Sequence, residues 1–372
     1  MKVIMTGGGT GGHIYPAIAI ADKIKEKSPS SEIMFIGVKR GKENELVPAA
    51  GYKIEFIKVH GLDRKNLFRN INVSREYLQA RKDAGKIIKQ FCPDAVIGTG
   101  GYVCAPALKA AHLQGIKTYI QEQNAMPGLA NRMMEKHVEK VFLGFEEAGK
   151  GFKYPDKHIV TGNPVRKEFF SADKKEAKKE ARKELGIKQK DFVLLAFGGS
   201  QGAGRINKSM ISVIEKYNGR ENMQIFFATG SYYHMPVMNE LGEKGIRLKE
   251  NVNVISYIND MHKYLNAADL VISRSGAITV SEIAVCGKPS ILIPSPIVTG
   301  DHQTFNAKVL SEKGAAILME EKNMREETLE QEIEKLIKDD EALSKMAKSA
   351  EKCAPVDAAE MICHYIADRE QI

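Results

Sequence analysis

The sequence predicts two α/β domains, each with a doubly wound parallel sheet and helices on both faces. Apolar, β-branched runs alternate with helix-like stretches along the whole chain, which is the pattern of strands joined by crossover helices. Glycine-rich segments follow three of the expected strands, at residues 7–13, 98–102 and 197–204, and the first and third of them open the two halves of the chain. The length of 372 residues exceeds the size at which one core usually keeps growing. We therefore expect two such domains facing each other across a cleft.

The boundary between the domains is expected where the alternation stops. Residues 150–166 contain two prolines and two glycines around a short expected strand, and we interpret them as the linker. The first domain then covers residues 1–163 and the second residues 164–353, while the tail at 339–368 is helical in pattern and its last part, about 354–372, is expected to pack back on the first domain. The expected strands are residues 3–5, 33–36, 54–59, 95–97, 118–120 and 141–143, then 192–197, 225–228, 252–256, 270–273, 291–293 and 315–319.

The composition favours a soluble intracellular protein with an anionic ligand. Lys and Arg exceed Asp and Glu by 55 − 47 = 8 charges, a surplus that suits phosphates, anionic lipid or nucleic acid. The five cysteines have no C-x-x-C spacing, which favours reduced thiols. The chain begins directly with an expected strand, and no apolar run approaches the roughly 20 residues that cross a bilayer. Attachment to a membrane surface stays open.

The first glycine loop has the spacing of a nucleotide- or phosphate-binding turn. Gly7, Gly9 and Gly12 stand in G-x-G-x-x-G register between a strand and a helix, where free N–H groups and the helix dipole attract phosphate. In dinucleotide-binding proteins an acidic residue ends the next strand and holds the ribose. Here that strand is followed by Lys39 and Arg40, so NAD is excluded and only an NADP interpretation survives beside phosphate binding.

His13 directly follows the last glycine of this loop. A helix N-terminus favours the neutral imidazole, which suits a general base near neutral pH. The alternative is a histidine that only caps the helix or binds phosphate. The residues themselves leave the two interpretations open.

The second glycine loop matches the first. Residues 99–102 align with residues 10–13, so that Tyr102 replaces the imidazole, and the pair of loops is suited to hold a diphosphate. Tight turns needed only for helix packing are the alternative.

Further along, four polar residues at 121–124 follow a strand, at the edge of the sheet where ligands of parallel strands bind. Glu122 is the only acid among them and is a second candidate base, or the partner that orients one.

The second half contains the nucleotide-binding candidates. Ser200 and Gln201 lie inside the third glycine loop, where a hydroxyl and backbone amides suit a phosphate. Glu282 lies on the helix after the strand at 270–273, and a carboxylate there suits both ribose hydroxyls. His302 and Gln303 open a helix at the mouth of the sheet, which suits the hydroxyls of a sugar.

Two ligand classes are disfavoured and one remains open. No Asp-x-Asp pair occurs and the histidines are scattered, so we expect no metal ion and no cofactor. Tryptophan is absent and no aromatics interleave with a basic stripe, so nucleic acid is not an expected partner. Between residues 62 and 75 apolar and basic residues alternate, with Leu67, Phe68 and Ile71 as the expected contacts to an anionic membrane surface. An ordinary partly buried loop is the alternative.

Taken together, these motifs resemble the MurG family of UDP-N-acetylglucosamine transferases. The resemblance covers essentially the whole chain, with family-like order and spacing. It is carried by MTGGGTGGHIYP, IGTGGYVCAP, QEQNAMPGLANR, GNPVR, FGGSQGA, SRSGAITVSEI and DHQTFNA. The joint occurrence of these motifs is far more specific than any one of them.

The resemblance implies a GT-B fold and an inverting, metal-independent transfer. GlcNAc would move from UDP-GlcNAc to the C4 hydroxyl of MurNAc in undecaprenyl-diphospho-MurNAc-pentapeptide, the step from lipid I to lipid II of peptidoglycan synthesis. His13 and Glu122 would be catalytic. The implied donor-binding residues are Thr10, Gly11, Gly12, Asn124, Arg166, Ser200, Gln201, Ile258, Arg274, Glu282, His302 and Gln303. The implied acceptor- or diphosphate-binding residues are Gly9, His13, Gly100, Gly101, Tyr102 and Asn131, with Asn124 also near the acceptor.

The same resemblance implies a peripheral location on the cytoplasmic face of the cell membrane. Two alternatives share the expected fold: a UDP-GlcNAc epimerase, which needs no lipid acceptor, and a noncatalytic nucleotide-sugar sensor. The sequence leaves the identity of the base, His13 or Glu122, open.

Overall fold

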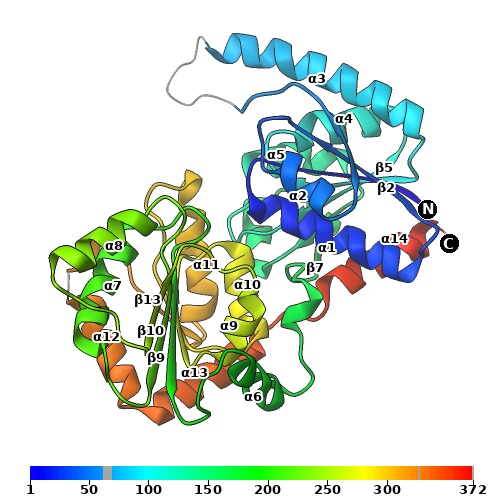
Figure 1. Cartoon of the computed structure of the whole chain (residues 1–372). Helices are drawn as coiled ribbons and strands as arrows, with labels where there is room; N and C mark the ends of the chain where they lie inside the picture. Colours follow the sequence, from blue (N-terminus) through cyan, green and yellow to red (C-terminus); the bar gives the residue numbers. More distant parts are fainter. Residues whose placement is uncertain (62–68, 326, 371–372) are drawn as a thin grey trace. The chain divides into compact units, whose positions relative to one another are not determined.

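The computed structural model describes residues 1–61, 69–325 and 327–370 and divides into two compact units (Figure 1). Unit 1 consists of residues 1–166 together with residues 355–372, and unit 2 of residues 167–354. Each unit has its own parallel sheet and its own hydrophobic core, and each is described by itself below.

Unit 1 is built on a seven-stranded sheet in the order β3-β2-β1-β4-β5-β6-β7, with every neighbouring pair parallel. The first strand lies inside the sheet and the order reverses beside it, and in doubly wound sheets ligands bind at the carboxyl ends of the strands on either side of such a reversal, here β1 and β4. The strands are β1 (Lys2–Gly7), β2 (Glu32–Gly37), β3 (Lys53–Phe56), β4 (Ala95–Gly100), β5 (Lys117–Glu122), β6 (Lys140–Leu143) and β7 (His158–Val160).

Helices cover both faces of this sheet because the central strands are buried on both sides. The helices of unit 1 are α1 (Gly11–Lys27), α2 (Glu43–Ala49), α3 (Arg69–Phe91), α4 (Cys104–Leu113), α5 (Leu129–Met134) and α14 (Ala358–Glu370). One core lies between the sheet and α3 and α4, the other between the sheet and α1 and α14.

The C-terminal helix α14 belongs to unit 1 although its sequence is remote from the rest of that unit. Ile362 and Ile366 are fully buried in the core beside α1, and the ring of Tyr365 packs edge-on against Phe142 with centroids 5.6 Å apart. Lys23 of α1 pairs with Asp357 at 3.1 Å, just before the helix begins. In Figure 1 the red helix α14 accordingly lies along the blue helix α1.

Unit 2 has a six-stranded parallel sheet in the order β10-β9-β8-β11-β12-β13, again with the first strand inside. Its strands are β8 (Phe192–Phe197), β9 (Met223–Ala228), β10 (Val252–Ile255), β11 (Leu270–Ser273), β12 (Ser290–Leu292) and β13 (Ala316–Leu318). The helices are α6 (Lys174–Glu184), α7 (Gly204–Tyr217), α8 (His234–Glu243), α9 (Met261–Ala267), α10 (Ala277–Val285), α11 (His302–Ser311), α12 (Thr328–Ile337) and α13 (Asp340–Lys352). Helices α7, α8 and α12 cover one face of the sheet, and α9, α10 and α11 cover the other (Figure 1).

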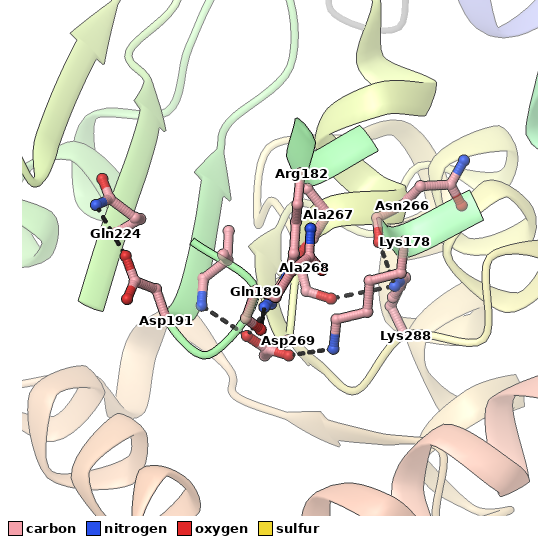
Figure 2. A network of polar contacts seen from close by, with 11 residues as sticks. Lys178, Arg182, Gln189, Asp191, Gln224, Asn266, Ala267, Ala268, Asp269 and Lys288 are labelled. Carbon is pink, nitrogen blue, oxygen red and sulfur yellow. Dashed lines mark hydrogen bonds and ion pairs between the residues drawn. The ribbon is translucent and has the colours of Figure 1, made fainter. Parts of the chain in front are cut away.

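A network of buried and half-buried charges lies at the amino ends of the strands of unit 2 (Figure 2). Asp269, directly before β11, accepts from Lys178 Nζ at 2.5 Å, Arg182 Nη2 at 2.7 Å and the Val193 N–H at 2.7 Å. Lys288 lies beside it and donates to the carbonyls of Asn266 and Ala268 at 2.8 and 3.1 Å. Burial, and second the charge of Lys178, lower the pKa of Lys288 to about 8.

Three expectations about local structure need correction. The strand expected at 54–59 ends at Phe56, where the chain leaves the edge of the sheet. The short strand expected inside the linker is β7, and because it pairs with β6, residues 150–166 belong to unit 1 instead of forming a separate linker. The helical tail is two helices, α13 and α14, because Pro355 lacks an N–H and disfavours helix before it.

Candidate active site

The two glycine loops of unit 1 pack directly against each other. The Gly8 N–H donates to the Gly100 carbonyl at 3.3 Å, and a Cβ on Gly101 would come within 2.5 Å of the Gly8 oxygen. Gly101 has φ +84°, a left-handed conformation that favours glycine. Only small residues permit this close approach, which brings the N-terminus of α1 next to the turn that precedes α4.

His13 lies over this glycine pair. A Cβ on Gly100 would come within 2.7 Å of its Nδ1, so the glycine makes room for the imidazole. Nδ1 lies 2.8 Å from Oε1 of Gln123, and Nε2 has no hydrogen-bond partner within the described part of the chain. The His13 carbonyl accepts from the Thr99 hydroxyl at 2.8 Å, which fixes the first turn of α1. The arrangement leaves one ring nitrogen free to exchange a proton.

Glu122 is a fully satisfied buried carboxylate. It is 1% exposed at the end of β5 and accepts from the backbone N–H and the side-chain amide of Asn124 at 2.9 and 3.1 Å. Its other oxygen accepts from the Gly128 N–H at 2.9 Å and from Asn131 Nδ2 at 2.8 Å. Four donors occupy about all the lone pairs of a carboxylate. This geometry favours the interpretation of Glu122 as a group that orients the 123–131 loop, rather than as a base.

The other acceptor candidates surround the same place. Tyr102 is partly exposed beside Gly9, whose Cβ would lie 3.9 Å from the tyrosine ring. Asn131 is buried, and its Oδ1 has no hydrogen-bond partner in the described part of the chain. The Gly100 N–H is directed to Cys104 Sγ at 3.1 Å, so the contribution of Gly100 seen here is space for His13. Diphosphate contacts of Gly9, Gly100 and Gly101 stay predictions.

Glu43, which no sequence motif indicated, fills the inside of the first glycine loop. Its carboxylate is fully buried and accepts from the N–H groups of Gly9 at 2.9 Å and Val38 at 3.1 Å. A Cβ on Gly8 would come within 2.4 Å of this carboxylate, and one on Gly41 within 1.9 Å. The chain therefore supplies its own anion to one N–H of the loop. In the sequence, only the glycines at positions 8 and 41 could have indicated this buried carboxylate. Their role becomes clear only in the folded chain, where both lie against Glu43.

Unit 2 contains an open cavity of about 480 Å³ at the carboxyl ends of its strands. The third glycine loop forms one wall: Gly202 has φ +85°, and a Cβ there would come within 2.1 Å of the Thr229 carbonyl. The opposite wall holds Arg274, whose Nη1 donates to the Ile293 and Pro294 carbonyls at 3.1 and 2.9 Å and pairs with Glu321 at 2.9 Å. The guanidinium is thus held rigidly at the cavity.

Two of the predicted donor-binding residues, Arg274 and Gln303, line this cavity. Gln303 Oε1 accepts from the Ser295 N–H at 2.8 Å. Ser200 and Gln201 are exposed on the same glycine loop, and His302 begins α11 beside Gln303. Arg205, to which the sequence analysis gave no role, also lines the cavity and donates to the Met324 carbonyl.

The remaining donor candidates are not among the residues that line this cavity. Ile258 is buried and Glu282 half-buried on α10, and neither is among the residues that line the cavity. Arg166 is the last residue of the first segment of unit 1, 5.4 Å from the ring of Tyr15. Thr10, Gly11, Gly12 and Asn124 also belong to unit 1. Donor contacts of all these residues stay predictions.

Within residues 1–61, 69–325 and 327–370 the side chains form no group of three His, Cys, Asp or Glu residues that could hold a metal ion. No helix in the same described residues is long and apolar enough to cross a membrane. Of the expected membrane contacts, Leu67 and Phe68 lie outside the described residues, and the side chain of Ile71 is not described.

Comparisons with known proteins agree with this division into two units. Residues 3–143 match the glycosyltransferase family 28 N-terminal domain, and residues 193–362 match the glycosyltransferase family 28 C-terminal domain. The crystal structure of MurG from Acinetobacter baumannii superposes with a TM-score of 0.78, at 28% identity and 99% coverage of both chains. The site and the fold therefore define a family 28 glycosyltransferase, and the expected GT-B fold of two doubly wound domains is confirmed.

The relatives define the family more narrowly. A protein of Acetivibrio thermocellus is 44% identical over 99% of this chain and 98% of its own length, and one of Alkaliphilus metalliredigens is 42% identical over 97% of each. Both are named UDP-N-acetylglucosamine--N-acetylmuramyl-(pentapeptide) pyrophosphoryl-undecaprenol N-acetylglucosamine transferase. The chain belongs to this family, the MurG family of glycosyltransferases, as the sequence motifs indicated. A UDP-GlcNAc 2-epimerase from Neisseria meningitidis, with a TM-score of 0.67 at 15% identity, shares the fold alone.

Proposed function

We propose that the chain transfers GlcNAc from UDP-GlcNAc to the C4 hydroxyl of MurNAc in undecaprenyl-diphospho-MurNAc-pentapeptide. Membership of the family, at 44% identity over nearly the whole length of both chains, supports the donor and the acceptor. The observation that carries the chemistry is the hydrogen bond of His13 Nδ1 to Gln123, which leaves Nε2 available beside the paired glycine loops.

The reaction is a single displacement with inversion at the anomeric carbon. His13 Nε2 takes the proton of the acceptor hydroxyl, the hydroxyl oxygen forms the new bond to the anomeric carbon, and the bond to UDP breaks with its electron pair leaving on the diphosphate. The proton then resides on the imidazole, whose Nδ1 still donates to Gln123. One nitrogen of the ring therefore handles the proton while the other holds the ring in place.

The cavity of unit 2 is proposed as the donor site. Its third glycine loop leads into the 14-residue helix α7, whose N-terminal N–H groups and dipole stabilise a diphosphate as its negative charge grows. Arg274, held by Glu321 and two carbonyls, adds fixed positive charge at the cavity wall. Glu282 is proposed to bind the ribose hydroxyls. Helix dipoles and guanidinium groups then supply the charge stabilisation that a metal ion provides in other transferases.

The acceptor is proposed to bind unit 1, with its diphosphate at the glycine loops. Helices α4 and α5 also expose apolar side chains: Leu113 is 60% and Met133 55% exposed. Leu113 directly follows His112, whose ring contacts that of His137 with centroids 4.8 Å apart, and Lys109 lies 3.2 Å from the His137 ring. Apolar side chains next to lysines are typical of a surface that rests on anionic lipid. We propose that this α4–α5 surface holds the protein on the cytoplasmic face of the membrane.

UDP release in the presence and absence of the lipid-linked muramyl acceptor tests the proposed reaction. Release that requires both UDP-GlcNAc and the acceptor is the expected result. Acceptor-independent conversion of UDP-GlcNAc would identify an epimerase, and binding of UDP-GlcNAc without turnover would identify a sensor, so either would overturn the proposal.

For the membrane surface, Leu113→Asp with Met133→Asp should reduce sedimentation with phosphatidylglycerol vesicles while leaving UDP binding unchanged. Unchanged sedimentation would contradict the proposed surface.

A further inference from the structure

The side-chain amide of Gln123 has only one orientation that fits its surroundings. Its Nε2 lies 2.6 Å from the Thr99 carbonyl oxygen, 2.9 Å from the Gln121 carbonyl oxygen and 2.6 Å from Oε1 of Gln121. Two of these three atoms are backbone oxygens, which can only accept hydrogen bonds. A flipped amide would place Oε1 against them, and at 1% exposure water cannot relieve that repulsion. The NH₂ group therefore points to the carbonyls and Oε1 points to His13.

This orientation determines which nitrogen of His13 carries the proton. Oε1 of Gln123 can only accept, so the bond of 2.8 Å to Nδ1 requires a proton on Nδ1. In the neutral ring the lone pair is then on Nε2, the nitrogen without a partner in the described residues. A ring without this acceptor could place its single proton on either nitrogen, and only one of the two tautomers can act as a base through Nε2.

Gln121 and Asn163 hold Gln123 in place through their own side-chain amides. Gln121 Nε2 donates to Asn163 Oδ1 at 3.1 Å, and Asn163 Nδ2 donates to the backbone carbonyl of Gln123 at 3.0 Å. Gln121 and Asn163 are both fully buried. Because no member of this amide set titrates, the orientation of Gln123 does not change with pH.

We propose that Gln123 is a positioning residue that holds His13 in the tautomer with the proton on Nδ1 and the lone pair on Nε2. Its catalytic importance rests on the proposed role of His13 as the base, whereas the tautomer itself is a property of unit 1 alone. The network thus performs by neutral hydrogen bonds the orienting task that a buried carboxylate performs for a catalytic histidine in serine proteases.

Nitrogen NMR of the full-length protein with ¹⁵N-labelled histidine tests the proposal without any substrate. At pH 8 the protonated and unprotonated ring nitrogens of a neutral histidine resonate far apart, and His13→Ala identifies the signals of His13 among the nine histidines. The expected result is a protonated Nδ1 and an unprotonated Nε2. A proton on Nε2 in the wild-type protein would overturn the proposal by itself.

Two variants and one control extend the test. Gln123→Met keeps the length of the side chain and removes the acceptor, so the His13 signals should shift toward a mixture of tautomers and kcat should fall about 10- to 100-fold. Gln123→Glu retains an acceptor for His13 but sets its second oxygen against the Thr99 and Gln121 carbonyls, so it should keep the proton on Nδ1 at a cost in stability. Gln114→Leu removes an exposed amide that donates to the Gly85 carbonyl in the same unit, and should change neither property. Unchanged tautomer and kcat in folded Gln123→Met, checked by circular dichroism, would refute the proposal.

The two proposals fail in different ways. If His13→Ala retains normal turnover, the base assignment fails while the tautomer of His13 can still depend on Gln123. If His13→Ala is inactive but Gln123→Met leaves the tautomer unchanged, the base assignment stands and the role of Gln123 fails.

Discussion

Two glycine loops, the first in unit 1 and the third in unit 2, have the same local sequence pattern but differ in what occupies the space beside them. Both follow the first strand of a parallel sheet and lead into a helix. The loop in unit 1 is filled by side chains of its own unit, with Glu43 inside it and His13 above it. The loop in unit 2 borders an open cavity of about 480 Å³.

The difference shows that a glycine-rich turn specifies close backbone approach rather than a ligand. In unit 1 the close approach is made by the neighbouring loop, a buried carboxylate and an imidazole, while Thr10 and Gly12 stay exposed beside them. In unit 2 the equivalent space is open and faces a fixed arginine. The first arrangement suits proton transfer and the second suits a nucleotide. Four substitutions test this contrast.

The largest effect is expected for His13→Ala. Loss of a general base should lower kcat by about 10²- to 10⁴-fold, while UDP affinity, assigned to unit 2, should stay nearly unchanged. Steady-state turnover with both substrates and calorimetric titration of UDP measure the two quantities. His364→Ala, an exposed histidine on α14, is the matched control. Near-normal turnover in His13→Ala would remove the assignment of the base.

A large loss of stability is expected for Glu43→Ala. The substitution leaves the buried N–H groups of Gly9 and Val38 without an acceptor and empties the space beneath the loop. Unfolding free energy should fall by about 2–4 kcal/mol. Because the chain lacks tryptophan, urea denaturation is best followed by circular dichroism. Glu45→Ala, exposed on the same helix, should cost much less; equal losses in the two variants would show that the internal anion is not what supports the loop.

A smaller effect on binding is expected for Glu282→Ala. Loss of the proposed ribose contact should weaken UDP affinity by about tenfold, consistent with one hydrogen-bonded charged group. The control is Glu312→Ala, an exposed acid that follows α11 in the same unit. Calorimetry with UDP measures both variants. Unaltered affinity in Glu282→Ala would discredit the ribose contact and leave the cavity wall around Arg274 to hold the nucleotide.

The smallest effect concerns the buried cation of unit 2, which contrasts with the buried anion of unit 1. Lys288 has its pKa lowered to about 8, so between pH 8 and 10.5 the unfolded chain binds more protons than the folded one and stability from this group rises with pH. Between pH 8 and pH 9 the gain is about 1 kcal/mol.

Lys288→Met should abolish this pH-dependent contribution to the free energy of unfolding. The two carbonyls left without a donor should lower the free energy of unfolding by an amount that does not depend on pH. Urea denaturation of both proteins at pH 8 and pH 9 gives the difference in slope. Parallel pH dependence of the two proteins would contradict a lowered pKa at Lys288.

The sequence patterns predicted some regions of the structure more accurately than others. Strand β8 was predicted at its observed bounds, since a continuous apolar run between turns has one plausible structure in an α/β chain. The bounds of β3 were missed because an edge strand ends where its only neighbour, β2, ends. The apolar run at 54–59 continues past that point, so the sequence does not show where the pairing stops. Among the site residues, Arg274 and Gln303, which were expected to bind the donor, both line the cavity of unit 2, while their contacts with a donor stay a prediction. Glu43 was missed because it lies 34 residues from the Gly9 N–H that it accepts from.

The sequence alone determined the fold class, the family and the strand-to-helix turns. Hydrophobic periodicity and glycine spacing are local properties, so they can be read from residues that are close together along the chain. The tertiary structure decided what each turn holds. Whether Glu122 has a lone pair to spare, which way the amide of Gln123 points, and which nitrogen of His13 keeps its proton all depend on donors and acceptors contributed by residues far apart in the chain. Buried polar groups must satisfy one another in space, and only the folded chain brings those partners together.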